Sequence, residues 1–181
     1  MSVQCNVEMV YSNKMPYKNH DDFDLDINPY NGGEMVNLLN LLEQVDTDLK
    51  LMIKKLLRGI FLNNERCLSA GELSPEEIKR LYSLFCKKMK SKKFMTDFKS
   101  AIPEYERIYR RIEHLDIWYT EGGKRHFLTT NDLIPPIELA DYLKRNVPYS
   151  VAQYGPKFLV SFLKLLIKHK VGLKMSVNYD G

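Results

Sequence analysis

Hydrophobic residues recur every three or four positions through the first half of the chain, and this spacing predicts amphipathic helices. One such pattern begins near residue 34 and another covers 49–62, with the capping candidates 46–48 between them. Additional leucines widen the apolar arc of both helices, so we expect them to be buried on more than one side. A further helix is predicted from about residue 103 to residue 113.

A near-complete helix-start signal follows a predicted loop at 63–72. Ser74 is a preferred N-cap residue, Pro75 suits the first helical position, and Glu77 has the spacing of a capping box. Leu73 and Ile78 flank the signal as a hydrophobic staple. The sequence therefore predicts a helix that begins at Ser74. Its apolar face is expected to contain Ile78, Leu81, Tyr82, Phe85 and Met89.

The hydrophobic spacing changes after residue 114. Strand-forming residues fill 116–119 and 126–129, and the glycine-containing segment 121–124 between them predicts a β-hairpin. The remaining elements are expected to be a short helix at 138–145, an apolar helix from Pro156 and a strand at 173–177.

These elements predict a mainly α fold, in which an N-terminal helical bundle precedes a small C-terminal α+β module with a β-hairpin. Residues 1–33 are expected to form an acidic arm or partly ordered segment, with one strand at 3–11 before the break at 31–33. The helical domain is predicted at 34–113 and the small α+β domain at 114–181.

The composition describes a folded protein, with 44% hydrophobic and 28% charged residues among 181. No apolar run is long enough to cross a membrane, and no signal peptide is recognised at the N-terminus. Three separated cysteines, Cys5, Cys67 and Cys86, indicate a reducing compartment. We therefore expect an intracellular protein, nuclear or cytoplasmic, that is not secreted and does not contact a membrane.

The charge is distributed unevenly along the chain. Residues 1–48 carry nine acidic and two basic side chains, so the remainder holds almost the entire positive charge. This asymmetry predicts that the acidic segment binds a basic surface, either on this chain or on a neighbour. The basic remainder is then able to face nucleic acid or an acidic partner.

The densest basic cluster stands at the end of the helix that begins at Ser74. Three interpretations remain open for it: a solvated helix end, contact with nucleic-acid phosphates, or contact with an acidic protein surface. The residues predicted to make such contacts are Lys87, Lys88, Lys90, Lys92 and Lys93.

No catalytic, cofactor or metal motif stands out. Asp22, Asp24 and Asp26 resemble the start of a calcium loop, but Ile27 and Gly33 occupy the positions that need glycine and glutamate. The histidines lack metal-ligand spacing, and no nucleophile motif is present. We therefore expect no cofactor and no enzymatic activity, with a small enzyme that has a dispersed site near His126 as the remaining alternative.

Apolar side chains in excess of what a small domain buries predict contact with other subunits. The residues expected at a partner interface lie on the 49–62 helix and on the hairpin. They are Leu49, Met52, Ile53, Leu56, Trp118 and Tyr119.

The order of these parts resembles subunits of the GINS complex, a component of the eukaryotic replicative helicase. The similarity covers residues 34–98 and 154–177. Within them it is carried by the 49–62 helix, the Leu-Ser-Pro-Glu-Glu start at 73–77 and the ending at 155–173. The arginine-rich stretch that the family often carries is missing, since only Arg58 and Arg66 are available. A shorter stretch at 154–163 is similar to one helix of chromatin MRG domains.

The resemblance implies a non-enzymatic scaffold subunit in a nuclear hetero-oligomer that acts in DNA replication. The sequence itself favours a structural or interaction subunit of a multiprotein complex. The alternative is a nucleic-acid-binding module that uses the basic cluster at 87–93.

Overall fold

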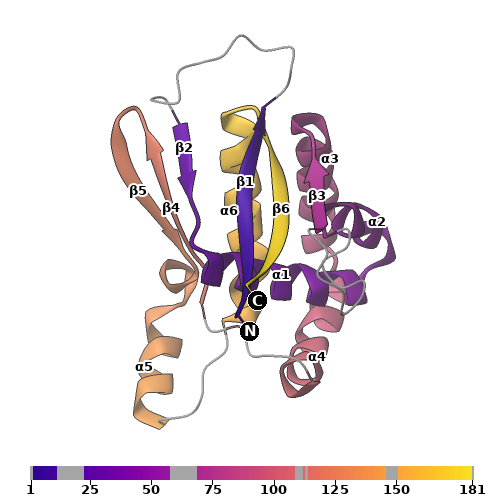
Figure 1. The fold of residues 1–181 in the computed structure, drawn as a ribbon. Helices are drawn as coiled ribbons and strands as arrows, with labels where there is room; N and C mark the ends of the chain where they lie inside the picture. The colour runs from indigo at the N-terminus through magenta and orange to yellow at the C-terminus, as the bar shows by residue number, and fades with distance from the viewer. Residues whose placement is uncertain are drawn as a thin grey trace.

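The computed structural model of the protein describes residues 2–11, 23–57, 69–108, 112, 114–145 and 151–180. Within them, helices and two three-stranded antiparallel sheets surround one continuous hydrophobic core (Figure 1). This mixture of helices and small sheets agrees with the predicted combination of α and β structure. The end of the predicted 49–62 helix and most of the predicted 63–72 loop lie outside the described residues.

The first sheet joins the beginning of the chain to its end. Strand β1 (Ser2–Tyr11) pairs along its whole length with β6 (Val171–Asp180), and the two termini lie together in Figure 1. The predicted strand at 3–11 is confirmed. The expectation of an acidic arm over 1–33 is wrong for this strand, because β6 supplies its hydrogen-bonding partners.

Strand β3 (Ser69–Leu73) forms the other edge of the first sheet, within the segment predicted to be a loop. It pairs with β6, where Leu73 lies opposite Leu173 and both side chains are buried. Gly71 permits this position, because a Cβ atom there would lie 1.9 Å from the carbonyl oxygen of Leu56. Strand β3 therefore lies directly against the end of helix α2 (Thr47–Leu56).

The second sheet contains the predicted hairpin. Strands β4 (Asp116–Glu121) and β5 (Lys124–Thr129) pair with each other, and β2 (Phe23–Asp26) pairs with the free side of β4. Gly122 and Gly123 have φ angles of 56° and 73°, which suit a tight hairpin turn. The calcium-loop pattern is not followed by the described part of this segment, since Asp24 and Asp26 belong to an extended strand.

Helix α1 (Pro29–Val45) begins earlier than the predicted start near residue 34. The side chain of Asn28 accepts a hydrogen bond from the Asn31 amide, and Pro29 occupies the first turn. Gly32 lies inside the helix instead of ending regular structure. A Cβ atom at Gly32 would lie 2.2 Å from the carbonyl oxygen of Cys5, so glycine allows α1 to pack closely against β1.

Helix α3 (Pro75–Met89) begins where the sequence predicts it. The Ser74 hydroxyl accepts from the Glu77 amide at 3.2 Å, and the Glu77 carboxylate accepts from the Ser74 amide at 2.8 Å. The capping box is therefore confirmed. Of the five residues expected on its inner face, Ile78, Leu81 and Phe85 are buried, whereas Tyr82 and Met89 are partly buried.

Helix α4 (Lys92–Ile108) begins well before residue 103, where the sequence predicted its start. Phe94, Phe98 and Tyr105 are buried on one face, and the Ser91 hydroxyl accepts from the Phe94 amide at 3.3 Å. Pro103 lies within this helix and does not begin it. Burial of aromatic residues from both sides of Pro103 outweighs the helix-breaking tendency of proline.

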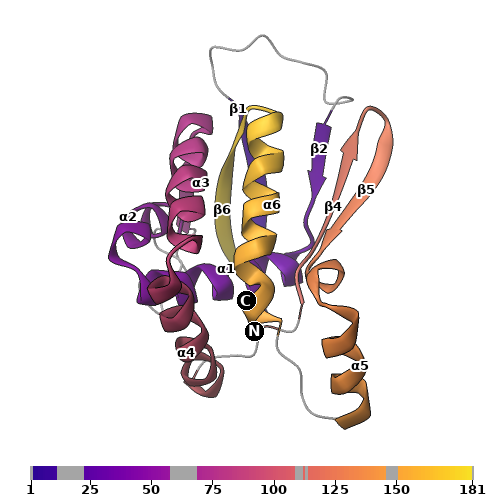
Figure 2. The ribbon, with the colours of Figure 1, turned by 180° about the vertical axis from the view of Figure 1, so that it is seen from behind.

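Helix α6 (Gly155–Lys168) lies between the two sheets and packs against α3 (Figure 2). Phe158, Phe162 and Leu166 on α6 are fully buried in the common core. The predicted boundary between residues 113 and 114 does not separate two cores, because β6 pairs with β1 and β3, and β2 pairs with the hairpin. Strand pairing between distant segments, which helical periodicity does not encode, produces this arrangement.

The core encloses a cavity of about 20 Å³ between α1, α2, α3 and α6, lined only by apolar side chains such as Leu49, Phe85 and Phe162. It is a packing void that offers no polar group to a ligand. In the described ranges, no helix combines the length and the apolar character needed to span a bilayer.

Candidate interaction surface

The second sheet presents an exposed aromatic pair on the face turned away from the core. Asp26 on β2 lies opposite Trp118 on β4, and Trp118 lies opposite Phe127 on β5, so these three side chains form one row. Trp118 is 40% exposed and Phe127 is 42% exposed. Their ring centroids are 4.3 Å apart, with the ring planes inclined by 31°. Two large aromatic side chains therefore stand together at the surface.

Charged residues surround this aromatic pair. The neighbouring row of the same face contains Asp24, Thr120 and Arg125. The guanidinium of Arg125 lies 4.5 Å from the centroid of the Trp118 ring, and its Nη2 atom lies 3.1 Å from a carboxylate oxygen of Asp26. The face thus combines an apolar centre, a cation on its surface and carboxylates at its margin.

The opposite face of the sheet packs against the body of the protein. Ile117 is buried, and Tyr119 stacks on His126 with a centroid distance of 5.1 Å. Phe23 lies 6.2 Å from the Tyr119 ring and stacks on His169 at 3.8 Å. Tyr119, predicted at a partner interface, is partly buried, and its ring contacts residues of its own chain.

Glu121 fastens this inner face to the end of α6. Its carboxylate binds Lys168 and lies 2.7 Å from Nε2 of His169. Hydrogen bonds from Lys168 and then His169 lower the pKa of Glu121 below its ordinary value. This contact ties the inner face to the end of α6. The exposed aromatic residues Trp118 and Phe127 therefore lie on the other, outer face of the sheet.

Helix α5 (Pro136–Arg145) extends away from the body, beyond the lower end of this sheet in Figure 1. Ile137 is 80% exposed and Leu139 is 41% exposed. The Glu138 carboxylate accepts a hydrogen bond from the Tyr154 hydroxyl, which anchors the first turn of the helix to the segment before α6. A helix of this length is not stable alone in water, so its exposed apolar residues are suited to contact with a partner.

The residues predicted at an interface on α2 lie elsewhere. Leu49, Ile53 and Leu56 are at most 1% exposed and belong to the protein's own core. Met52 is partly buried against the same core. The prediction of Leu49, Ile53 and Leu56 as partner contacts is therefore wrong for the chain in this fold, whereas that of Met52 stays a prediction. Leu51, which sequence periodicity did not single out for contact, is 76% exposed on the opposite side of α2.

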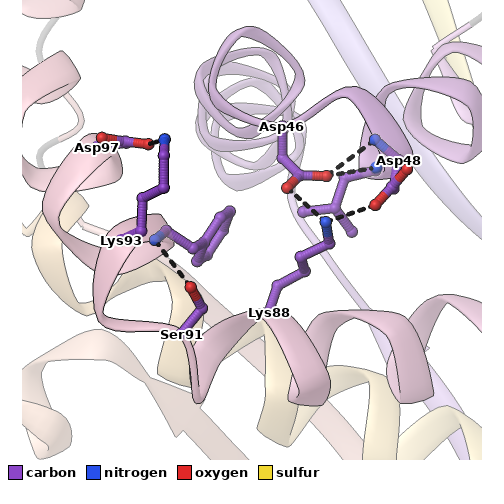
Figure 3. A network of polar contacts seen from close by, with 8 residues as sticks. Asp46, Asp48, Lys88, Ser91, Lys93 and Asp97 are labelled. Carbon is purple, nitrogen blue, oxygen red and sulfur yellow. Dashed lines mark hydrogen bonds and ion pairs between the residues drawn. The ribbon is translucent and has the colours of Figure 1, made fainter.

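Two members of the basic cluster form ion pairs within the chain. Lys88 on α3 places its Nζ atom 2.9 Å from Asp46 and 2.5 Å from Asp48. Figure 3 shows the lysine side chain reaching both carboxylates. Lys93 lies 2.5 Å from Asp97 along helix α4. The Lys88 side chain is 23% exposed and is engaged by two carboxylates, whereas Lys93 is 85% exposed in its pair with Asp97. The role of both lysines in contacting a partner stays a prediction.

The other three members of the cluster are Lys87, Lys90 and Lys92, and all are exposed. No ion pair engages them within the described residues.

Asp46 joins this ion pair to the start of α2. Its carboxylate accepts hydrogen bonds from the amides of Asp48 at 2.9 Å and Leu49 at 3.0 Å. Burial raises the pKa of Asp46, but the bond from Lys88, the two amides and the lysine charge together outweigh burial and lower that pKa. The carboxylate therefore acts as helix cap and ion-pair partner at once.

The acidic N-terminal segment is neutralised in part by the basic remainder of the same chain. Ion pairs join Asp46 and Asp48 to Lys88, and Asp26 to Arg125. Longer pairs join Glu8 to Lys174 at 3.7 Å and Glu43 to Lys54 at 3.8 Å. These ion pairs agree with the predicted attraction between the acidic segment and basic side chains of the same chain, and binding of that segment to a neighbour stays a prediction.

His126 is the residue around which the alternative enzymatic site was predicted. It is partly buried and stacks on Tyr119. The core cavity supplies no acid, base or nucleophile. No group of three or more metal-ligating side chains comes together among the residues that the structure describes.

Comparison with protein families, with curated proteins and with solved structures found no match to the chain.

Proposed function

We propose that this protein is a non-enzymatic interaction subunit of a multiprotein complex. Its docking surface would be the outer face of the β2–β4–β5 sheet together with α5. The observation that carries this proposal is the exposed pair Trp118 and Phe127, whose ring centroids are 4.3 Å apart. Aromatic residues in contact at a surface are typical of the residues that dominate protein–protein binding.

The distribution of burial supports the choice of this face over α2. Leu49, Ile53 and Leu56 are already covered by the chain, whereas Trp118, Phe127 and Ile137 remain exposed. In this proposal, helices α1 to α4 serve as a scaffold bundle. They support α6, which in turn supports the sheet from its inner side.

The partners in this proposal are other protein subunits, and the assembly is a hetero-oligomer. A GINS-like replication assembly in the nucleus is the specific hypothesis that the sequence resemblance adds. That hypothesis rests on the sequence pattern at 73–77 and at 155–173.

Co-isolation of the tagged full chain, with mass spectrometry and sedimentation velocity, tests the proposal. We expect protein subunits to be recovered in a fixed ratio to the chain. Recovery of the chain alone, as a stable monomer, would contradict the proposal.

The second candidate function is nucleic-acid binding through Lys87, Lys90 and Lys92. Their exposure, without the ion pairs that engage Lys88 and Lys93, favours it. The affinity for DNA or RNA would then fall steeply with salt. Charge reversal at these three lysines tests this function and leaves the contacts of Lys88 intact. Unchanged binding of DNA or RNA by the variant would contradict it.

A further inference from the structure

A guanidinium group of the chain itself already lies on the outer face of the second sheet. Arg125 lies over the Trp118 ring at 4.5 Å, and the same side chain reaches Asp26 at 3.1 Å. This arrangement combines a cation–π contact with a carboxylate counter-charge. Arg125 is itself 62% exposed and Asp26 is 68% exposed, so this ion pair lies open to solvent.

The charges on this face favour a cationic partner. Asp24 and Asp26 are exposed carboxylates on the outer face, beside Arg125. A third carboxylate of that face, Asp116, accepts a hydrogen bond from the Thr129 hydroxyl and lies 3.3 Å from Nε2 of His114. Phosphate groups would meet carboxylates here, which disfavours nucleic acid despite the aromatic pair. A guanidinium on a protein segment matches both the aromatic rings and the carboxylates.

We propose that this face docks an arginine-bearing segment of a partner protein, whose guanidinium takes the place of Arg125 between Trp118 and Asp26. The inference rests on the proposed function and names the chemistry of its partner. The displaced Arg125 side chain turns to solvent, and Phe127 extends the apolar contact under the incoming segment. Asp24 contributes a second carboxylate at the margin of the site.

Trp118 is the single tryptophan of the chain, so its fluorescence reports directly on this site. The probe is an acetylated, amidated peptide in which arginine alternates with glycine, titrated into the full-length protein. We expect a saturable change in Trp118 emission at peptide concentrations below about 1 mM. The matched lysine–glycine peptide should bind more weakly, because an ammonium does not stack on the rings as a guanidinium does.

Two pairs of variants separate this site from general charge attraction. The double variant Asp24→Asn/Asp26→Asn should lower the affinity for the arginine peptide about tenfold. The double variant Glu72→Gln/Glu76→Gln removes two exposed carboxylates elsewhere and should leave that affinity unchanged. Arg125→Ser should strengthen binding, because it vacates the site. Lys124→Ser removes the same charge from the neighbouring residue on the other face and should have a smaller effect.

The inference is overturned if the arginine peptide produces no saturable change, if the lysine peptide binds equally, or if the two carboxylate variants behave alike. A saturable response to an oligothymidylate, without one to the peptide, would assign the face to nucleic acid instead. Failure of the peptide, with protein partners still lost on replacement of Trp118 and Phe127, would reject the arginine chemistry alone. Failure of both would reject the docking surface.

Discussion

Asp26 on β2 and Arg125 on β5 form an ion pair across the intervening strand β4, although they stand 99 positions apart in the sequence. The contact crosses the Trp118 ring, so three strands contribute to one surface feature. Since the ring and both charged groups are solvent-exposed, their arrangement is better suited to recognition than to stability.

Replacement of Trp118 by alanine should cost little stability. Its ring is partly exposed, so we expect a loss of at most about 1–2 kcal/mol, from the cross-strand and cation–π contacts. The adjacent residue Ile117 is 1% exposed, and Ile117→Ala should cost about 2–5 kcal/mol. Urea unfolding of the two variants measures the difference. Equal losses would contradict the assignment of the two faces of β4.

The capping box at Ser74 should contribute measurably to stability. Ser74→Ala removes the acceptor for the Glu77 amide and should cost about 1 kcal/mol. Ser83→Ala, at an exposed position inside the same helix, should change stability by no more than about 0.5 kcal/mol. Thermal unfolding followed by circular dichroism compares the two. A Ser74→Ala protein as stable as Ser83→Ala would show that the cap is dispensable.

Gly71 should tolerate no side chain. A Cβ atom would lie 1.9 Å from a backbone oxygen of α2, so Gly71→Ala must separate β3 from α2, at a cost of at least about 1–3 kcal/mol. Gly33 on α1 has open space around it, and Gly33→Ala should stabilise the helix by about 0.5–1 kcal/mol. Relative to the wild type, the denaturation midpoint should fall for Gly71→Ala and rise for Gly33→Ala. A harmless Gly71→Ala would contradict the close packing of β3.

Asp46 should make stability depend on pH in the acidic range. Its pKa is lower in the folded protein than in the unfolded chain, so its stabilising contribution is complete above the unfolded value. That contribution is lost as the pH falls through the lower, folded value. Lys88→Met removes the lysine that helps lower this pKa, so the variant should lose less stability between about pH 5 and pH 2.

Lys90→Met is the matched control for this pH dependence, because Lys90 is exposed on the same helix end and forms no ion pair with Asp46. Its acid unfolding profile should follow that of the wild type. Identical profiles for Lys88→Met and the wild type would show that the ion pair has no thermodynamic effect.

The sequence predicted local features well because they depend on neighbouring residues. The Ser74 cap, the Asp46 cap and the hairpin turn at Gly122 each combine residues within a few positions of one another. Even so, local sequence signals gave wrong predictions where the structure of a segment depends on its contacts with distant residues. Gly32 lies within helix α1 against the backbone of Cys5, a contact between distant residues that the local sequence does not indicate.

The residues of the candidate site were also predictable from the sequence only in part. Trp118 was expected to contact a partner because of its residue type, and its exposure is consistent with that role. Leu49 and Ile53 were given the same role from helical periodicity, which identifies an apolar face but not whether the chain itself covers it. Phe127, Asp26 and Arg125 join Trp118 through strand pairing over long sequence distances, a relationship that the linear pattern does not contain.

The most direct test of the docking surface compares co-isolated proteins from cells that express three tagged forms of the full chain: the wild type, Trp118→Ser/Phe127→Ser and Leu51→Ser. Leu51 is the control because it is an exposed apolar residue on α2, away from the second sheet. We predict that the double variant folds but loses partner proteins that the wild type and Leu51→Ser both retain. Retention of the same partners in the same amounts by all three forms would contradict the assignment of the outer face as the docking surface.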